Sequence, residues 1–212
     1  MKAPKELLEV CVLLGSVLAL PAADGSHSYF DFDVGAAIRQ DVKVKEALGM
    51  SVSGGRISFD PGVRLDISGG YSFNDTLEVG IETGMLYNNI RRLTSAGVSA
   101  SPGAIFGADV GFYQVPILAN VIFTPPLPSP LRPFIGGGAG GVASIIAGST
   151  ISTESDFTFA YEGIAGFAYA IAPKIDFGLT YKFLGTTDHT FDSVKTGETY
   201  SHSILATFTF KF

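Results

Sequence analysis

The sequence has little of what soluble or nucleic-acid-binding proteins are rich in. It has no tryptophan, one cysteine and only 16% charged residues, where soluble domains carry about 25%. A basic balance is also absent, because 20 Asp and Glu outnumber 14 Lys and Arg and leave a formal net charge of −6. Nucleic-acid binding depends on clustered Lys and Arg, so we expect no nucleic-acid partner.

The chain also lacks a long apolar run. No segment approaches the roughly 20 apolar residues that a membrane-spanning helix needs, although hydrophobic residues make up 46% of the 212 positions. What is abundant is glycine (26), phenylalanine (17) and tyrosine (8). An apolar chain without spanning helices favours strands in a membrane.

Residues 1–23 predict a cleavable signal peptide. Lys2 and Lys5 form a basic start, an apolar core runs from Val10 to Leu20, and small residues follow at Pro21–Ala23. A retained amphipathic or anchoring helix is the alternative. The only cysteine, Cys11, lies in this core. The mature chain, residues 24–212, should therefore hold no disulfide and no reactive thiol.

The mature chain divides into runs in which apolar and polar residues alternate with the period of a strand. The eight runs are Tyr29–Lys43, Ile57–Phe73, Leu77–Ile90, Ala108–Phe123, Arg132–Ile146, Phe157–Ile171, Ile175–Leu184 and Thr199–Phe212. Short connections at 74–76, 124–131 and 172–174 alternate with long polar ones near 44–56, 92–107, 147–156 and 185–198. Outer-membrane barrels alternate short periplasmic turns with longer external loops in this way.

The polar faces of these runs decide between a soluble sandwich and a membrane barrel. A sandwich would expose many Lys and Glu to water, whereas these faces carry single charges among Gly, Ser, Thr and Ala. That composition suits a narrow, filled barrel interior. An open sheet edge is too unfavourable in lipid, so the sheet must close. We therefore predict an all-β fold, an eight-stranded antiparallel up-and-down transmembrane barrel.

Four stretches resemble the small outer-membrane barrels of the OmpA-like and opacity-protein-like family. They are Tyr113–Asn120, Pro133–Gly141, Asp176–Phe183 and His202–Phe212. The resemblance implies a bacterial outer-membrane location. It also implies that Phe212, which follows Phe208 and Phe210 at two-residue spacing, is part of a terminal signal read by the outer-membrane assembly machinery.

Alternation places a set of charged residues on the interior face of the predicted barrel. Buried charges must be paired, so the simplest interpretation is a salt-bridge network that fills the lumen, and the alternative is a gated path for ions. The predicted lumen charges are Asp31, Asp33, Arg39, Arg64, Asp66, Glu78, Glu82, Glu162, Asp176, Lys182 and Lys211.

The sequence gives little support for a catalytic carboxylate pair, a serine hydrolase or a metal site. Glu78 and Glu82 are about 13 Å apart along a strand, too far for cooperating carboxylates. His202 and its neighbours Ser201 and Ser203 should point to opposite faces, which argues against a serine hydrolase. The three histidines show no metal-ligand spacing. Pro116 lies within a run and predicts a bulge or a missing ladder bond.

The sequence thus predicts a monomeric, non-catalytic outer-membrane barrel without cofactor or metal. Its expected role is structural, in envelope integrity or in displaying loops such as 185–198 for surface interaction. A small porin-like channel and a lipid-modifying enzyme are the alternatives. The expected partners are outer-membrane lipid and lipopolysaccharide, the assembly machinery, and a host or surface ligand bound through the loops.

Overall fold

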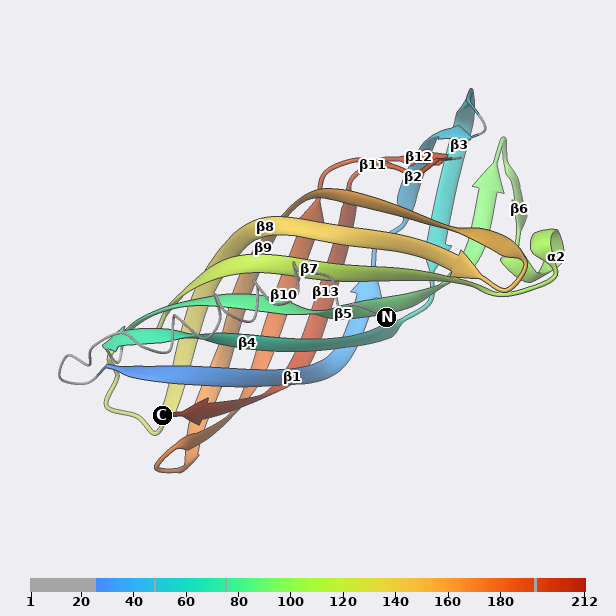
Figure 1. The fold of residues 1–212 in the computed structure, drawn as a ribbon. Helices are drawn as coiled ribbons and strands as arrows, with labels where there is room; N and C mark the ends of the chain where they lie inside the picture. The colour runs from blue at the N-terminus through green and yellow to red at the C-terminus, as the bar shows by residue number, and fades with distance from the viewer. Residues whose placement is uncertain (1–25, 48, 75, 193) are drawn as a thin grey trace, which may run out of the picture.

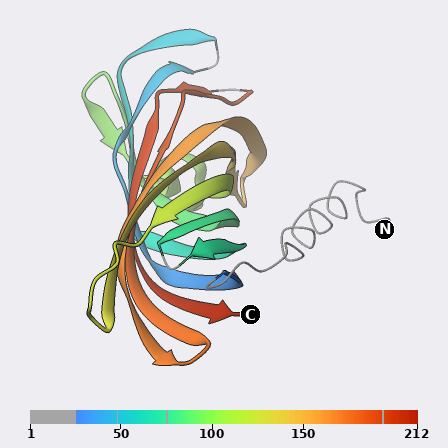
Figure 2. The same ribbon diagram turned by 90° about the vertical axis from the view of Figure 1, so that its left-hand side faces the viewer.

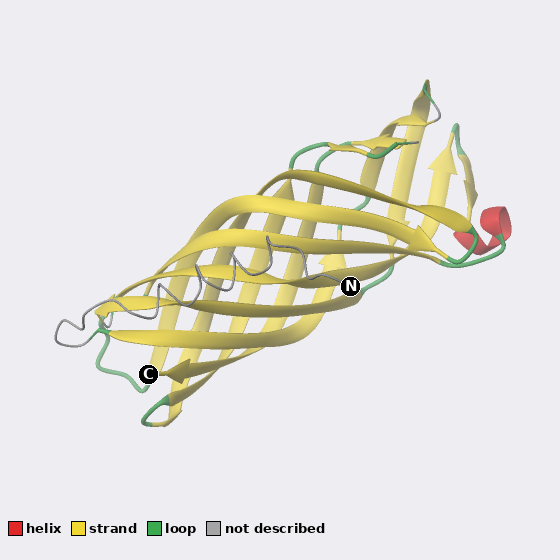
Figure 3. Cartoon of the chain, in the orientation of Figure 1, coloured by secondary structure: helices red, strands yellow, loops and turns green. Residues whose placement is uncertain are grey.

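The computed structural model describes residues 26–47, 49–74, 76–192 and 194–212, and the predicted signal peptide 1–23 lies outside them. Long antiparallel strands form one tilted barrel (Figures 1 and 3). Its members are β1 (His27–Arg39), β4 (Gly62–Asn74), β5 (Leu77–Ser95), β7 (Val110–Phe123), β8 (Leu131–Gly148), β9 (Ile151–Ala172), β10 (Ile175–Thr186) and β13 (Thr199–Lys211). No helix among the described residues is long and apolar enough to cross a membrane.

Closure occurs between the first strand and the last. Strand β1 pairs with β4 on one side and with β13 on the other, so that Phe30 faces both Gly69 and Phe210 in register. The ring continues through β10, β9, β8, β7 and β5 back to β4. The predicted eight-stranded barrel is confirmed, and an open sandwich is excluded.

The end of the barrel with the long connections carries further elements. These are β2 (Val42–Ala47), β3 (Met50–Phe59), β6 (Val98–Ala100), the short helix α2 (Pro102–Phe106), β11 (His189–Thr190) and β12 (Val194–Thr196). Figures 1 and 2 show them projecting beyond the barrel. There β12 pairs with β2, β2 pairs with β3, and β3 pairs with the end of β5. We call these projecting elements, together with the end of β5 that pairs with them, the extension.

The extension corrects the prediction of long loops. Segment 44–56 is largely strand, segments 92–107 and 185–198 contain β6, α2, β11 and β12, and the 147–156 connection shrinks to a turn between Gly148 and Ile151. These Gly- and Ser-rich segments alternate poorly, which hid them in the sequence. They form strands because the barrel holds neighbouring chain ends side by side, which offers backbone partners that no single segment reveals.

The prediction of one strand over Ile57–Phe73 is also wrong. Strand β3 ends at Phe59 and β4 begins at Gly62. Pro61 lies between them and has no N–H for a ladder. The break sends β3 into the extension, while β4 stays in the barrel wall. Alternation on both sides of the proline concealed this division.

Pro116 behaves as its sequence predicts. Strands β5 and β7 pair at Thr83–Ile117 and again at Leu86–Gln114, but the ladder is interrupted between these pairs. The Thr83 hydroxyl donates to the Pro116 carbonyl at 2.8 Å and supports the gap. The missing proline N–H thus removes ladder bonds on one side only, because β8 stays in register past Pro116.

The two faces of the barrel differ as alternation requires. Outward-pointing Phe30, Leu179 and Ile204 are 40%, 56% and 60% exposed, whereas the inward-pointing Lys182 on β10 is only 3% exposed. A band of apolar side chains therefore surrounds a charged interior. This is the reverse of a soluble protein and matches a wall in contact with lipid.

Candidate functional site in the barrel lumen

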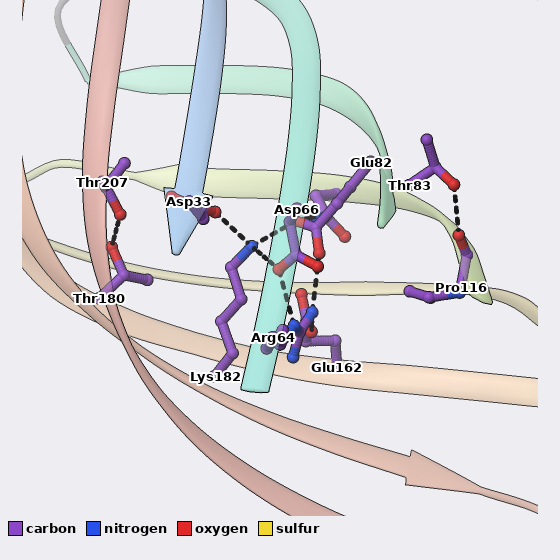
Figure 4. A network of polar contacts seen from close by, with 11 residues as sticks. Asp33, Arg64, Asp66, Glu82, Thr83, Pro116, Glu162, Thr180, Lys182 and Thr207 are labelled. Atoms are coloured by element: carbon purple, nitrogen blue, oxygen red, sulfur yellow. Dashed lines mark hydrogen bonds and ion pairs between the residues drawn. The ribbon is translucent and has the colours of Figure 1, made fainter. Parts of the chain in front are cut away.

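The centre of the lumen is an ion-pair network built from five strands. Lys182 of β10 points inward, and its Nζ donates to Asp33 Oδ2 at 2.7 Å, Asp66 Oδ2 at 3.0 Å and Glu82 Oε2 at 2.7 Å. Figure 4 shows the ammonium group among these three carboxylates, which come from β1, β4 and β5. One lysine thus ties together strands from both ends of the chain.

Arg64 of β4 forms the second cationic centre. Its Nε donates to Asp66 Oδ2 at 2.7 Å, and its Nη2 donates to Glu82 Oε1 at 2.9 Å and Glu162 Oε2 at 2.5 Å. Asp66 and Glu82 are shared with Lys182, so the two cations form one network (Figure 4). We call these six residues, Asp33, Arg64, Asp66, Glu82, Glu162 and Lys182, the central network.

The central network is buried and acidic. All six residues are at most 5% exposed, and four carboxylates face two cations. Oxygens of Asp33, Asp66 and Glu82 lie within 4.8 Å of one another, a spacing that suits a metal ion. Lys182 already occupies the position between them, since its Nζ contacts all three. The lysine therefore stands where a metal would bind.

A second, smaller group lies nearer the short-turn end. Asp176 accepts from Lys211 Nζ at 2.6 Å and also from Arg132, and Asp31 accepts from the Ser68 hydroxyl at 3.1 Å. With Glu78, they line a cavity of about 80 Å³ that ends at Lys182 and Glu82. A cavity of this size holds a few water molecules.

Sequence reasoning missed Arg132 as a lumen residue. It begins β8, and the predicted run began at the same residue, so its face was not assigned. The signal was present, because Arg132 shares parity with Phe134, which lines the same lumen cavity. Tyr29 was missed as well. Its hydroxyl lies where an added Cβ at Gly80 would come within 2.4 Å, so this glycine makes room for the ring.

An apolar layer closes the lumen directly beyond the central network. On β5, Leu86 follows Glu82, and on β10, Leu184 follows Lys182, toward the long-loop end. The layer is Leu86, Leu118, Val142, Ala160 and Leu184, which pack together and are at most 1% exposed. None of its members lines the cavity near Asp31. The described lumen therefore has a dry section between two polar ones.

Beyond the apolar layer lies a polar layer that consists mostly of uncharged side chains. Gln114 donates to Ser144 at 3.0 Å, and Thr186 and Thr199 share a hydrogen bond of 2.8 Å. Arg39, predicted with the lumen charges, lies here and not in the central network. It donates to Asn88 Oδ1 at 3.2 Å and packs its guanidinium 4.6 Å from the centre of the Phe112 ring.

The outermost layer of the lumen is an apolar cap under the extension. It consists of Val42, Ile57, Phe59, Ile90, Val110, Phe112 and Phe191. His189 of β11 lies beside it, fully buried, with its Nε2 2.9 Å from the Thr186 hydroxyl and its Nδ1 3.4 Å from Asp156. Burial lowers the pKa of His189, and Asp156 opposes that shift.

His202 lies on the outer face, as alternation requires. Its Nδ1 is 2.7 Å from the Tyr181 hydroxyl and its Nε2 is 2.9 Å from the Gln40 amide. Ser201 and Ser203 point inward and are 1% exposed. No described serine is hydrogen-bonded to this histidine, and the Ser–His arrangement of a hydrolase is not formed at this strand.

The terminal phenylalanines lie on the outer face at the short-turn end. The Phe208 ring packs 5.2 Å from that of Phe177, and Phe210 and Phe212 are 37% and 70% exposed. The Phe212 N–H donates to the Ser28 carbonyl at 2.9 Å, so the last residue is held against the start of β1. Lys211 points the other way, toward Asp176.

A closed antiparallel barrel with an apolar outer wall and a charged lumen defines the class of transmembrane β-barrels. The chain belongs to the outer membrane protein beta-barrel domain family, whose model matches residues 10–212. It is therefore a protein of the bacterial outer membrane. The long-loop end then faces outward and the short-turn end faces the periplasm.

Solved structures with the same fold are distant in sequence. Neisserial surface protein A is 19% identical, with 89% of this chain and 99% of that chain covered and a TM-score of 0.58. OprG from Pseudomonas aeruginosa is 14% identical (89% and 97% covered, TM-score 0.53), and the outer membrane protease OmpT from Escherichia coli is 10% identical (92% and 100% covered, TM-score 0.55). No curated protein sequence matches the chain.

Proposed function

We propose that this protein is a closed, non-catalytic barrel that serves envelope integrity and displays its extension at the cell surface. The observation that carries the proposal is the dry apolar layer, in which Leu86, Leu118 and Leu184 are at most 1% exposed. An ion that left the central network outward would have to enter this layer without water, which is unfavourable. The ion pairs of the central network then hold neighbouring strands together and do not form a conduction path for ions.

Conductance in planar lipid bilayers tests this proposal. We expect no steady unitary currents from the refolded wild-type protein. The Leu86→Gly/Leu118→Gly variant, which removes two side chains from the layer, should conduct and so shows that insertion is detectable. Steady wild-type currents that are lost with Glu82→Gln or Glu78→Gln would overturn the proposal in favour of a porin-like channel.

The enzymatic alternative has its own assay. The barrel fold is shared with the outer membrane protease OmpT, but fold alone does not carry catalysis. We expect no deacylation of outer-membrane lipid by the purified protein. Deacylation that is abolished by His202→Ala would contradict the non-catalytic proposal, because His202 faces the lipid side beside Tyr181 and Gln40.

We propose further that Phe208, Phe210 and Phe212 are read during assembly. Phe212 contributes one backbone bond to Ser28 and leaves 70% of its surface exposed, so its loss should hardly change the stability of the folded barrel. Deleting Phe212 should nevertheless lower outer-membrane levels of the protein in cells. If the variant without Phe212 reaches the same level in the outer membrane as the wild type, and its urea unfolding is also unchanged, the proposed assembly role is wrong.

Surface interaction would use the extension. Its tips expose apolar side chains, with Met50 and Val98 at 68% and 74% exposure. The barrel closes within one chain, which supports a monomer. Light scattering in detergent should give one chain per particle, and a stable dimer would contradict this expectation.

A further inference from the structure

One face of the extension gathers basic side chains from three adjacent strands. Lys43 of β2 pairs with Arg56 of β3, and paired residues in a sheet point to the same side. Ser58 lies two residues after Arg56, so its side chain points to the same side of the sheet, and it pairs with Arg92 of β5. Lys43, Arg56 and Arg92 therefore share one face, and all three are exposed.

A bulge adds a fourth base to this face. Ser58 faces Arg92, whereas Phe59 faces Ile90, so Arg91 is an extra residue in β5. Ile90 is 7% exposed, and both arginines after it are exposed. A bulge turns two successive side chains away from the buried side. We call Lys43, Arg56, Arg91 and Arg92 the basic face.

The opposite side of the same strands fixes which way the basic face points. Val42, Ile57 and Ile90 pack in the apolar cap over the lumen. Side chains that alternate with them must point away from the barrel axis. The basic face is therefore directed outward, toward the surroundings of the barrel and not into it.

The basic face carries excess positive charge in an acidic protein. Arg56 lies 3.6 Å from Asp41 and Arg91 lies 4.0 Å from Asp60, both loose, exposed pairs. Among the described residues no ion pair holds Lys43 or Arg92, which leaves four bases against two acids. The whole chain has a formal net charge of −6, so this local sign is the opposite of the average.

The height of the basic face matches the headgroup layer of the outer leaflet. On β5 the outward residue Tyr87 packs against Tyr113, with the ring centroids 4.7 Å apart and the rings tilted by 37°, and such an aromatic pair is typical of the membrane interface. Arg91 follows Tyr87 by four residues, or roughly 13 Å along a tilted strand. A strand tilted by about 45° gains roughly 9 Å of height over that length, and the polar headgroup region extends about 5–8 Å beyond the hydrocarbon core on each side.

We propose that the basic face binds the phosphate groups of lipopolysaccharide in the outer leaflet. Guanidinium forks and an ammonium group spaced across neighbouring strands suit phosphate oxygens. The proposal rests on the outer-membrane location and names a lipid partner for the proposed surface role. It is independent of whether the lumen conducts ions, so steady currents of the wild-type protein in lipid bilayers would contradict the closed-barrel proposal but not this one.

Binding of purified lipopolysaccharide to the refolded protein in detergent tests the proposal. Native mass spectrometry would compare lipopolysaccharide that carries its lipid A phosphates with a phosphatase-treated sample. The test variant is Lys43→Gln/Arg92→Gln, whose side chains are exposed. The control variant is Lys174→Gln/Lys195→Gln, which removes the same charge away from the basic face, in the turn between β9 and β10 and at the residue of β12 that is paired with Glu46.

We expect the test variant to bind phosphorylated lipopolysaccharide at least about tenfold more weakly, because the loss of one charge-assisted hydrogen bond alone corresponds to roughly that factor. The control should bind like the wild type, and the phosphatase-treated sample should bind weakly to every form. Equal weakening in test and control variants, or equal affinity for both samples, would overturn the proposal. Different migration of unboiled and boiled samples in gels confirms that each variant is folded.

Discussion

The central network and the apolar layer lie next to each other in one lumen and hold it closed by opposite means. The network binds five strands through charges with directional partners, as Lys182 does with three carboxylates. The apolar layer has no such partners and depends on fit, with Leu118 1% exposed. A narrow barrel can thus be filled by either chemistry, and within the central network every charge has a partner of opposite sign.

The two layers should therefore fail differently. Removing one cation from the network leaves buried carboxylates without a counter-charge, whereas truncating a leucine of the apolar layer leaves only a void.

The largest effect is expected for Lys182→Met. Asp66 and Glu82 would keep only Arg64 as a cation, and Asp33 would lose its ion pair with Lys182. We expect the free energy of unfolding to fall by about 3–5 kcal/mol, measured by urea unfolding in lipid vesicles. Lys211→Met is the control, because Asp176 keeps Arg132. A loss no larger than that of the control would contradict the role of Lys182 as the centre of the network.

A smaller effect is expected for Leu118→Ala in the apolar layer. The cavity left in a well-packed layer lowers the free energy of unfolding by about 3 kcal/mol. Leu179→Ala is a matched control, because Leu179 points outward, is 56% exposed and leaves no internal void. If both variants lose the same stability, the layer is less tightly packed than its burial indicates.

His189, which lies beside the apolar cap, should give a pH dependence. Burial lowers the pKa of His189 below its usual value, which is near 6.5. The unfolded chain then binds more protons at this residue than the folded one, so stability falls as the pH drops below about 6.5. Between pH 7.5 and 5.5, the urea midpoint of the wild type should fall further than that of His189→Gln. Parallel curves would show that His189 does not contribute.

The smallest effect is expected at the surface of the extension. Lys195 and Glu46 form an ion pair of 2.9 Å, but their side chains are 50% and 39% exposed. Water and salt screen such a pair, and Lys195→Ala should change the free energy of unfolding by less than about 0.5 kcal/mol. A change near that of Leu118→Ala would show that β12 and β2 depend on this contact.

Much of the barrel wall could be predicted from the sequence because alternation is local. The faces of β10 and β13 follow from the residues themselves, as Lys182 and Lys211 illustrate. The extension could not be predicted in this way. Strands β2 and β12 lie about 150 positions apart and pair only because the barrel brings their ends together. Pro61 was the one local sign that β3 and β4 are separate.

The sequence by itself determined that the wall is apolar outside and that charges point inward, because side chains of a strand alternate with a period of two. Only the tertiary structure decided which charges meet. Arg64 reaches Glu162 across 98 positions and Lys182 reaches Asp33 across 149. The physical reason is that strand register and tilt, fixed when the barrel closes, set the height of each side chain. These heights place Arg39 beyond the apolar layer and keep Lys182 beneath it.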